Sequence, residues 1–215
     1  MDKKELRQDP IREKILSTLS YVENNKMALY GIVGVVLAVI LVGSYISTSN
    51  KELNQKSSLN FGKAINSSIA GDKEVSLLLF EELLSEGSRS TSGNSLVYLL
   101  DYYMSDNNFE KVDSLLNLNI KITDNVLQSK VYAIQGDISL NNMEYDKSLE
   151  FYSKAGNSNP TIENYMTFKR AIVYYKSEKF KESKEVIEKL LENEDLQYDL
   201  KNQCDKYLFM LHNSI

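Results

Sequence analysis

The chain has 215 residues with 25 basic and 30 acidic side chains, a net charge of −5, and it contains one cysteine and one histidine. A single cysteine excludes an intramolecular disulfide and a cysteine-based zinc site. An acidic chain is poorly suited to nucleic acid, because phosphate binding needs a basic face.

Residues 1–26 are a short charged arm, in which we expect one amphipathic helix. Asp9 is placed to cap its start, and Pro10 suits the first helical position. Its apolar residues recur at helical spacing and are Ile11, Ile15, Leu16, Leu19 and Val22. Such a helix can lie on a membrane surface or pack on a partner's helices. A weakly ordered tail is the alternative.

Residues 27–46 are twenty residues without a charge, and they predict a transmembrane helix. Twenty helical residues extend roughly 30 Å, the thickness of a bilayer's hydrocarbon core. A buried core helix and a cleaved signal peptide are the competitors. The run is too long for a typical signal peptide, and no small-residue cleavage site follows it. We therefore expect an uncleaved signal anchor, in which Gly34 and Ala38 form a small-residue pair for contact with another membrane helix.

The basic residues around the span predict its orientation. Six lysines and arginines precede it, and three follow it in a comparable window, at Lys51, Lys56 and Lys63. Because basic residues are retained in the cytoplasm, we expect the N-terminus inside and the bulk of the chain on the far side.

Beyond the span, residues 47–56 are a linker or the start of a helix, and residues 57–215 are predicted to form one repeat domain. The apolar pattern is helical almost everywhere and nowhere alternates with period two, so the predicted fold class is all-α. Polar clusters interrupt it at 70–73, 86–94, 105–108, 121–125, 140–143 and 156–160. These breaks enclose helical hairpins that repeat about every 35 residues.

The clearest hairpin is residues 129–160. Seven of its residues fall at offsets 4, 8, 17, 20, 24, 27 and 32 of one repeat, namely Tyr132, Gly136, Tyr145, Ser148, Tyr152, Ala155 and Pro160. This pattern resembles the tetratricopeptide repeat, in which small residues let two helices approach closely and aromatic residues fill the gaps. The family's Trp at offset 4, Leu at 7 and Gly at 15 are missing, so we describe the repeat as tetratricopeptide-like.

The other hairpins follow this register with decreasing clarity. The next one repeats it after 35 residues with Ala171, Tyr174, Phe180, Ser183, Ile187 and Leu190. The preceding one keeps Tyr103, Phe109, Val112 and Leu116 but has no small residue near Leu100. The first, around Phe61 and Ala64, is the least regular. We expect about four tetratricopeptide-like hairpins in an α-solenoid, closed by a capping helix over residues 195–213.

The register predicts a concave groove lined by the first helix of each hairpin. Its residues are Tyr165, Phe168, Ile172, Tyr175 and Lys176 in the fourth hairpin, Lys130, Ala133, Asp137 and Leu140 in the third, and Val97, Asp101 and Met104 in the second. An apolar and aromatic stripe with a polar rim suits a partner's segment. The alternative is that the terminal helix folds over this stripe and buries it.

We find no catalytic constellation in the sequence. One histidine and one cysteine cannot supply the usual nucleophile and base pairs, and no phosphate-binding or metalloprotease motif occurs. We expect Cys204 to be a buried small hydrophobe and His212 a surface residue. The prediction is a protein that is not an enzyme and has no cofactor, no metal and no small-molecule substrate.

The layout of charged arm, signal anchor and degenerate repeats resembles the YfgM-type bacterial membrane proteins. That resemblance implies an ancillary subunit of the Sec translocon in the inner membrane, with a cytoplasmic N-terminus and a periplasmic repeat domain. The implied protein partners are translocon subunits, a PpiD-like periplasmic chaperone and exported chains.

Two other interpretations use the same domain. One is a tetratricopeptide scaffold of another envelope complex, in cell division or outer-membrane assembly. The other is a reversed topology with a cytosolic domain, as in the mitochondrial import receptors, against which the basic residues before the span argue.

Overall fold

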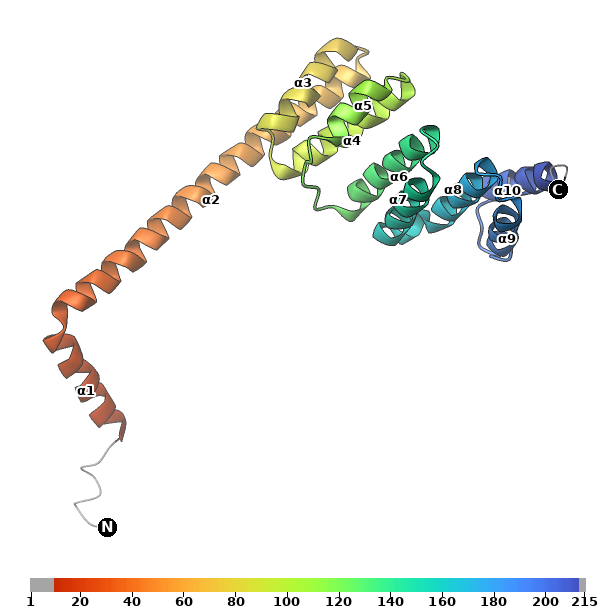
Figure 1. Cartoon of the computed structure of the whole chain (residues 1–215). Helices are drawn as coiled ribbons and strands as arrows, with labels where there is room; N and C mark the ends of the chain where they lie inside the picture. The colour runs from red at the N-terminus through yellow and green to blue at the C-terminus, as the bar shows by residue number, and fades with distance from the viewer. Residues whose placement is uncertain (1–9, 213–215) are drawn as a thin grey trace. The chain divides into compact units, whose positions relative to one another are not determined.

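The computed structural model describes residues 10–212, and these form helices joined by turns, without a strand (Figure 1). The all-α prediction is confirmed for this part of the chain. The chain divides into two compact units, Met1–Leu53 and Asn54–Ile215, which we call the N-terminal and C-terminal units.

The N-terminal unit contains α1 (Pro10–Asn24) and the first part of α2 (Lys26–Ile69). Helix α1 begins at the proline that the sequence places at a helix start. Asn25 alone separates it from α2, and its backbone N–H and side-chain amide both donate to the Tyr21 carbonyl, at 3.0 and 2.9 Å.

Helix α2 is long and apolar enough to cross a membrane, and 0% of its most apolar window is buried. This apolar window is therefore not part of the core, whereas the last turns of α2 contribute Ala64 to it. Residues 47–56, for which the sequence left a linker or a helix start open, are helical.

The C-terminal unit is an array of helices in which most pack on a neighbour in the chain, while α6 packs on α4 rather than on α5 (Figure 1). After the end of α2 the elements are α3 (Lys73–Glu86), α4 (Arg89–Ser105), α5 (Phe109–Leu116), α6 (Asn125–Asn141), α7 (Tyr145–Ser158), the 3-10 helix η2 (Pro160–Ile162), α8 (Glu163–Lys176), α9 (Phe180–Leu191) and α10 (Tyr198–His212). The last of these corresponds to the predicted terminal helix, whose final residue, Asn213, lies outside the described residues.

Four turns in this unit share one backbone geometry. Each contains a residue with positive φ, and these residues lie 36, 36 and 35 positions apart, at Gly71, Asn107, Met143 and Glu178. In every turn this residue donates its N–H to the carbonyl three positions earlier, and the next residue donates to the carbonyl five positions earlier. That is the Schellman arrangement at a helix end. The second helix of each hairpin begins two residues after the positive-φ residue.

A buried serine joins the two helices in three of these hairpins. The hydroxyls of Ser76, Ser148 and Ser183 donate to the carbonyls of Ala64, Gly136 and Ala171, each twelve residues earlier, at 3.0, 2.8 and 2.8 Å. The α4–α5 hairpin instead has Leu100 and Val112 at these positions, and neither side chain is exposed. An apolar pair there replaces the small residue and the hydroxyl.

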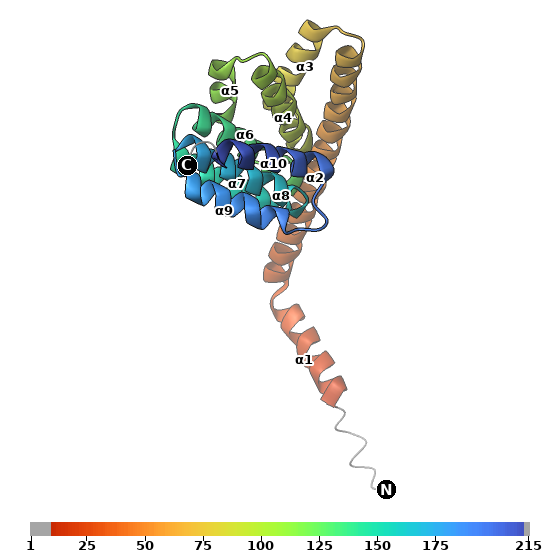
Figure 2. The same cartoon turned by 90° about the vertical axis from the view of Figure 1, so that its right-hand side faces the viewer.

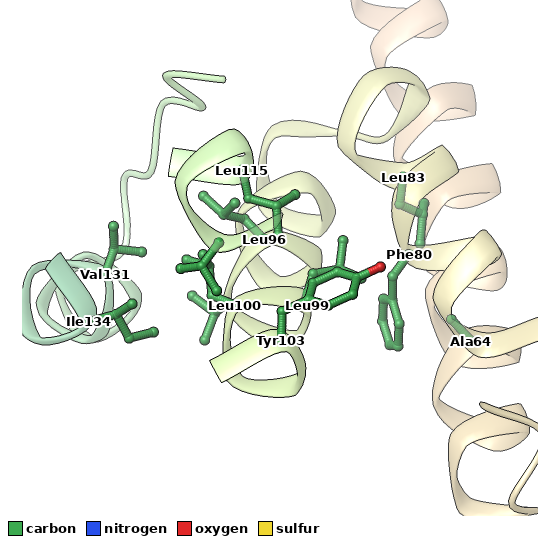
Figure 3. Packing of buried hydrophobic residues seen from close by; sticks show 12 residues of the cluster. Ala64, Phe80, Leu83, Leu96, Leu99, Leu100, Tyr103, Leu115, Val131 and Ile134 are labelled. Atoms are coloured by element: carbon green, nitrogen blue, oxygen red, sulfur yellow. The ribbon is translucent and has the colours of Figure 1, made fainter. Parts of the chain in front are cut away.

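The core lies between successive helices as three clusters rather than one centre. The first joins α2 to α6, and Figure 3 shows Phe80 reaching from α3 between Ala64 of α2 and the α4 side chains. The second surrounds the buried Tyr152, and the third fixes α10 onto α8 and α9 (Figure 2). Helices that bury their apolar faces mainly against neighbours are typical of solenoids.

Candidate functional site

The predicted groove residues lie on α4, α6 and α8, and the structure gives them unequal exposure. The exposed ones are Asp101, Lys130, Tyr165 and Lys176, the partly exposed ones are Met104, Ala133, Asp137, Leu140, Ile172 and Tyr175, and the buried ones are Val97 and Phe168. The exposed residues and, among the partly exposed ones, the Asp137 carboxylate and the Tyr175 hydroxyl offer functional groups to a partner. We call Asp101, Lys130, Asp137, Tyr165 and Lys169 the inner row.

Phe168 is a core residue, which corrects its prediction as a partner contact. Its side chain is 2% exposed, and its ring meets Tyr207 of α10 edge to face at a centroid distance of 5.4 Å. Tyr175 packs in the same way on Tyr207, at 5.7 Å, and Ile172 packs on the same cluster. Helix α10 therefore covers this part of the stripe. The sequence could not decide this, because core and groove residues share one helical spacing.

Four side chains from α6, α7 and α8 form a polar and aromatic cluster around Asp137. One Asp137 carboxylate oxygen accepts from the Tyr152 hydroxyl at 2.6 Å and from the Lys169 ammonium at 2.8 Å. The ammonium also lies 5.6 Å from the ring centroid of Tyr165, in cation–π geometry. Three helices are thus linked through one carboxylate, which fixes the neighbourhood of the exposed Tyr165.

The charges in this cluster are settled at neutral pH. Burial and then the Asp137 charge raise the pKa of Tyr152, so its hydroxyl stays protonated and donates. For Lys169, burial is the largest effect and lowers the pKa, but the contacts with Asp137 and Tyr165 outweigh it and leave the pKa raised. The carboxylate paired with the ammonium and the protonated tyrosine hydroxyl hold the side chains of Asp137, Lys169 and Tyr152 in place.

Asp101 and Lys130 continue the inner row on α4 and α6. Burial raises the pKa of the Asp101 carboxyl, and the positive charge of Lys130 opposes that rise. The row therefore alternates acidic and basic groups, from Asp101 through Lys130 and Asp137 to Lys169. Such alternation favours a partner of mixed charge over a uniformly charged one.

Sequence reasoning missed two members of this arrangement, Lys169 and Tyr152. Tyr152 was predicted only as a packing residue, although its hydroxyl supports the site. Lys169 lies 32 residues beyond Asp137, so no local spacing connects them. The repeat register supplied the only available signal, because it places the first helices of adjacent hairpins side by side.

The opposite side of α8 borders a hollow of about 600 Å³ that the sequence did not predict. Arg170 lines it and donates to Glu163 at 2.8 Å, to Thr167 at 2.7 Å and to Ser153 at 3.1 Å. The spacing of Glu163, Thr167 and Arg170 on one helix face is the signal that was available. Because Glu163 already neutralises Arg170, this network serves to hold α8 against α7.

Other candidate features lie apart from the inner row. Gly34 and Ala38 lie on α2, and a Cβ added at Gly34 would meet nothing within 4 Å, so another helix can approach it closely. Cys204 lies on α10 and is buried in the cluster that this helix forms with α8 and α9, and burial raises the pKa of its thiol to about 11. Within residues 10–212, no three His, Cys, Asp or Glu side chains are grouped to hold a metal ion.

No protein-family model matches this chain, and no curated protein is significantly similar to it. The resemblance to the YfgM-type proteins therefore remains a prediction from layout and repeat register.

Proposed function

We propose that this chain is a membrane-anchored protein-binding module without a catalytic role, and that the inner row is its contact surface. The observation that carries this proposal is the Asp137 cluster. It uses three helices to present a tyrosine whose side chain is 43% exposed, among charges of alternating sign. Exposed tyrosines in such settings are frequent anchors of protein interfaces.

The array itself is proposed to be tetratricopeptide-like. Turns spaced 36, 36 and 35 residues apart support this, as do the small residues that accept the buried serine bonds. Repeats of this length present the first helices of successive hairpins on one face. The inner row lies on such helices, α4, α6 and α8.

The anchor is proposed to be the apolar part of α2, with the N-terminus in the cytoplasm and the repeat array across the membrane. The uncharged run and the excess of basic residues before it support this. We propose the bacterial inner membrane as the location and an ancillary role at the Sec translocon, bound to a PpiD-like chaperone or to exported chains. The resemblance in layout to the YfgM-type proteins supports this role. The second candidate function is a scaffold of a cell-division or outer-membrane assembly complex.

Photocrosslinking of the full-length protein in native membranes tests these proposals. A photoreactive residue at Tyr165 samples the inner row, one at Val36 samples the membrane helix, and one at the exposed Asp113 of α5 is the control. We expect translocon subunits at Val36, and a chaperone or exported chains at Tyr165 but not at Asp113. Crosslinks to cell-division or outer-membrane assembly proteins would instead support the second candidate function. Equal products at Tyr165 and Asp113 would remove the inner row as the contact surface.

Substitution provides the second test. Tyr165→Ala is expected to reduce partner capture severalfold, while the matched change Tyr198→Ala leaves capture unchanged. Tyr198 is a fair control because it is 76% exposed and lies on α10, outside the inner row. Both variants should keep the helical content of the parent chain.

A further inference from the structure

Helix α1 has an apolar stripe that no described part of the chain covers. Its members are Ile15, Leu16 and Leu19, which are 55%, 54% and 56% exposed. At about 100° of rotation per residue, the three side chains fall within roughly 100° of arc on one side of the helix. Apolar groups arranged in this way need an apolar medium or an apolar partner.

The polar residues of α1 are compatible with a position at a membrane surface. The hydroxyls of Ser17 and Thr18 donate to the Lys14 carbonyl at 2.9 and 2.8 Å, and that of Ser20 donates to the Ser17 carbonyl at 2.9 Å. Thr18 borders the apolar stripe, and because its hydroxyl is bonded within the helix it makes little demand on water there. Ser17 lies on the opposite side of the helix, and Ser20 borders the stripe beside Leu16.

The chain connection determines which apolar medium α1 meets. Only Asn25 separates α1 from α2, and the uncharged run of α2 starts at Met27. Three helical residues span roughly 5 Å, so the end of α1 is held at headgroup level if α2 crosses the membrane. A lipid surface held this close has a high effective concentration, which a separate protein partner lacks.

The charges of α1 indicate how it is held. Arg12 lies one turn before Ile15 and Leu16, within the arc of the stripe, where its long side chain can extend to the headgroups. Glu13 and Lys14 lie outside that arc, Lys14 on the opposite side of the helix. The balance of charge is close to neutral, so burial of apolar area rather than attraction to anionic lipid provides the affinity.

We propose that α1 lies in the interface of the membrane that holds α2, with Ile15, Leu16 and Leu19 at the boundary of the acyl chains. This proposal rests on the membrane anchoring proposed above. It adds that the arm is a second, surface-bound part of the anchor, which binds neutral as well as anionic lipid.

Spin labels on the full-length protein in phosphatidylcholine vesicles test the proposal. In a Cys204→Ala background, labels are placed singly by Leu19→Cys on the apolar stripe and by Ser17→Cys on the opposite side. Collision with oxygen, which concentrates in lipid, is compared with collision with a water-soluble nickel chelate. We expect oxygen to dominate at position 19 and the nickel chelate to dominate at position 17.

Two results would overturn it. Nickel access at both positions would mean that α1 projects into water, and protection from both reagents would mean that α1 packs on protein. A third label, introduced by Val36→Cys, separates the two proposals. Oxygen access there shows that α2 is inserted whatever α1 does, whereas nickel access there would refute the anchor itself.

Discussion

The hydroxyl of Ser148 donates a hydrogen bond of 2.8 Å to the carbonyl of Gly136, where α7 passes closest to α6. The same bond recurs in the first and fourth hairpins, from Ser76 and from Ser183. Each serine is fully buried, so its bond replaces water for both helices. The recurrence makes this contact the fixed point of the hairpin geometry.

Loss of this bond should destabilise the array. Ser148→Ala removes the donor, and we expect the free energy of unfolding to fall by about 1 kcal/mol, as for other buried hydrogen bonds. The measurement is urea unfolding of the full chain in detergent, followed by circular dichroism. The matched control is Ser105→Ala, whose hydroxyl bonds its own helix at an exposed site and should change stability by less than about 0.5 kcal/mol. Equal effects of the two changes would contradict the assignment.

Gly136 should not tolerate a methyl group. A Cβ added there would lie 2.6 Å from a ring carbon of Tyr152, whose side chain is buried and held by Asp137. We expect Gly136→Ala to cost about 1–3 kcal/mol of stability, the usual result of overpacking. Gly62→Ala in α2 is the control. A Cβ there meets nothing within 4 Å, so this change should stabilise the helix by roughly 0.5–1 kcal/mol.

Substitutions of Phe168 and Tyr165 should differ in their effect on stability, because the first residue is buried in the core and the second is proposed to bind a partner. Phe168→Ala empties a buried position between α8 and α10 and is expected to cost about 3–5 kcal/mol. Tyr165→Ala should change stability by less than about 1 kcal/mol, because its side chain is exposed and lies outside the buried clusters. Unfolding curves of the two variants check this. A larger loss for Tyr165→Ala would make it a core residue and withdraw it from the inner row.

Cys204 should make stability fall in alkali. Burial raises the pKa of its thiol from 9.0 to about 11, so the folded chain holds the proton more tightly than the unfolded chain. The stability this contributes is complete below about pH 9 and is lost as the pH rises to about 11. Integrated over that interval, the loss is roughly 2–3 kcal/mol. Unfolding at pH 8 and pH 11 measures it, and Cys204→Ala should show a smaller loss over the same interval.

The same burial should protect the thiol from reagents. At pH 8 we expect a maleimide to modify Cys204 much more slowly in the folded chain than in urea. Equal rates would show that Cys204 is not buried between α10 and helices α8 and α9.

Much of the array was predictable, because polar clusters in the sequence mark its turns. The polar clusters at 70–73, 105–108 and 140–143 contain three of the four positive-φ residues. The first hairpin looked irregular in the sequence only because the second hairpin, which lies between it and the clear third one, lacks the small residue and the serine of the repeat. Two steps of 36 from Gly136 and Ser148 lead to Ala64 and Ser76, but the intermediate positions carry an apolar pair instead.

The site was less predictable than the fold. The register put Asp137 and Tyr165 on one face, but it could not show that Lys169 bonds to that carboxylate or that α10 covers Phe168. Both depend on how one hairpin is stacked on the next. Such contacts lie between residues that are far apart in the sequence and leave no periodic trace in it.

The four turns allow the cost of one backbone conformation to be compared between four residue types within the same chain. One left-handed position occurs four times with four residues, Gly71, Asn107, Met143 and Glu178. Glycine adopts this conformation freely and asparagine more readily than most, whereas methionine and glutamate adopt it at a cost of about 1 kcal/mol or more. Exchanging the four residues among the four turns would measure that cost within one molecule, with every turn as a control for the others.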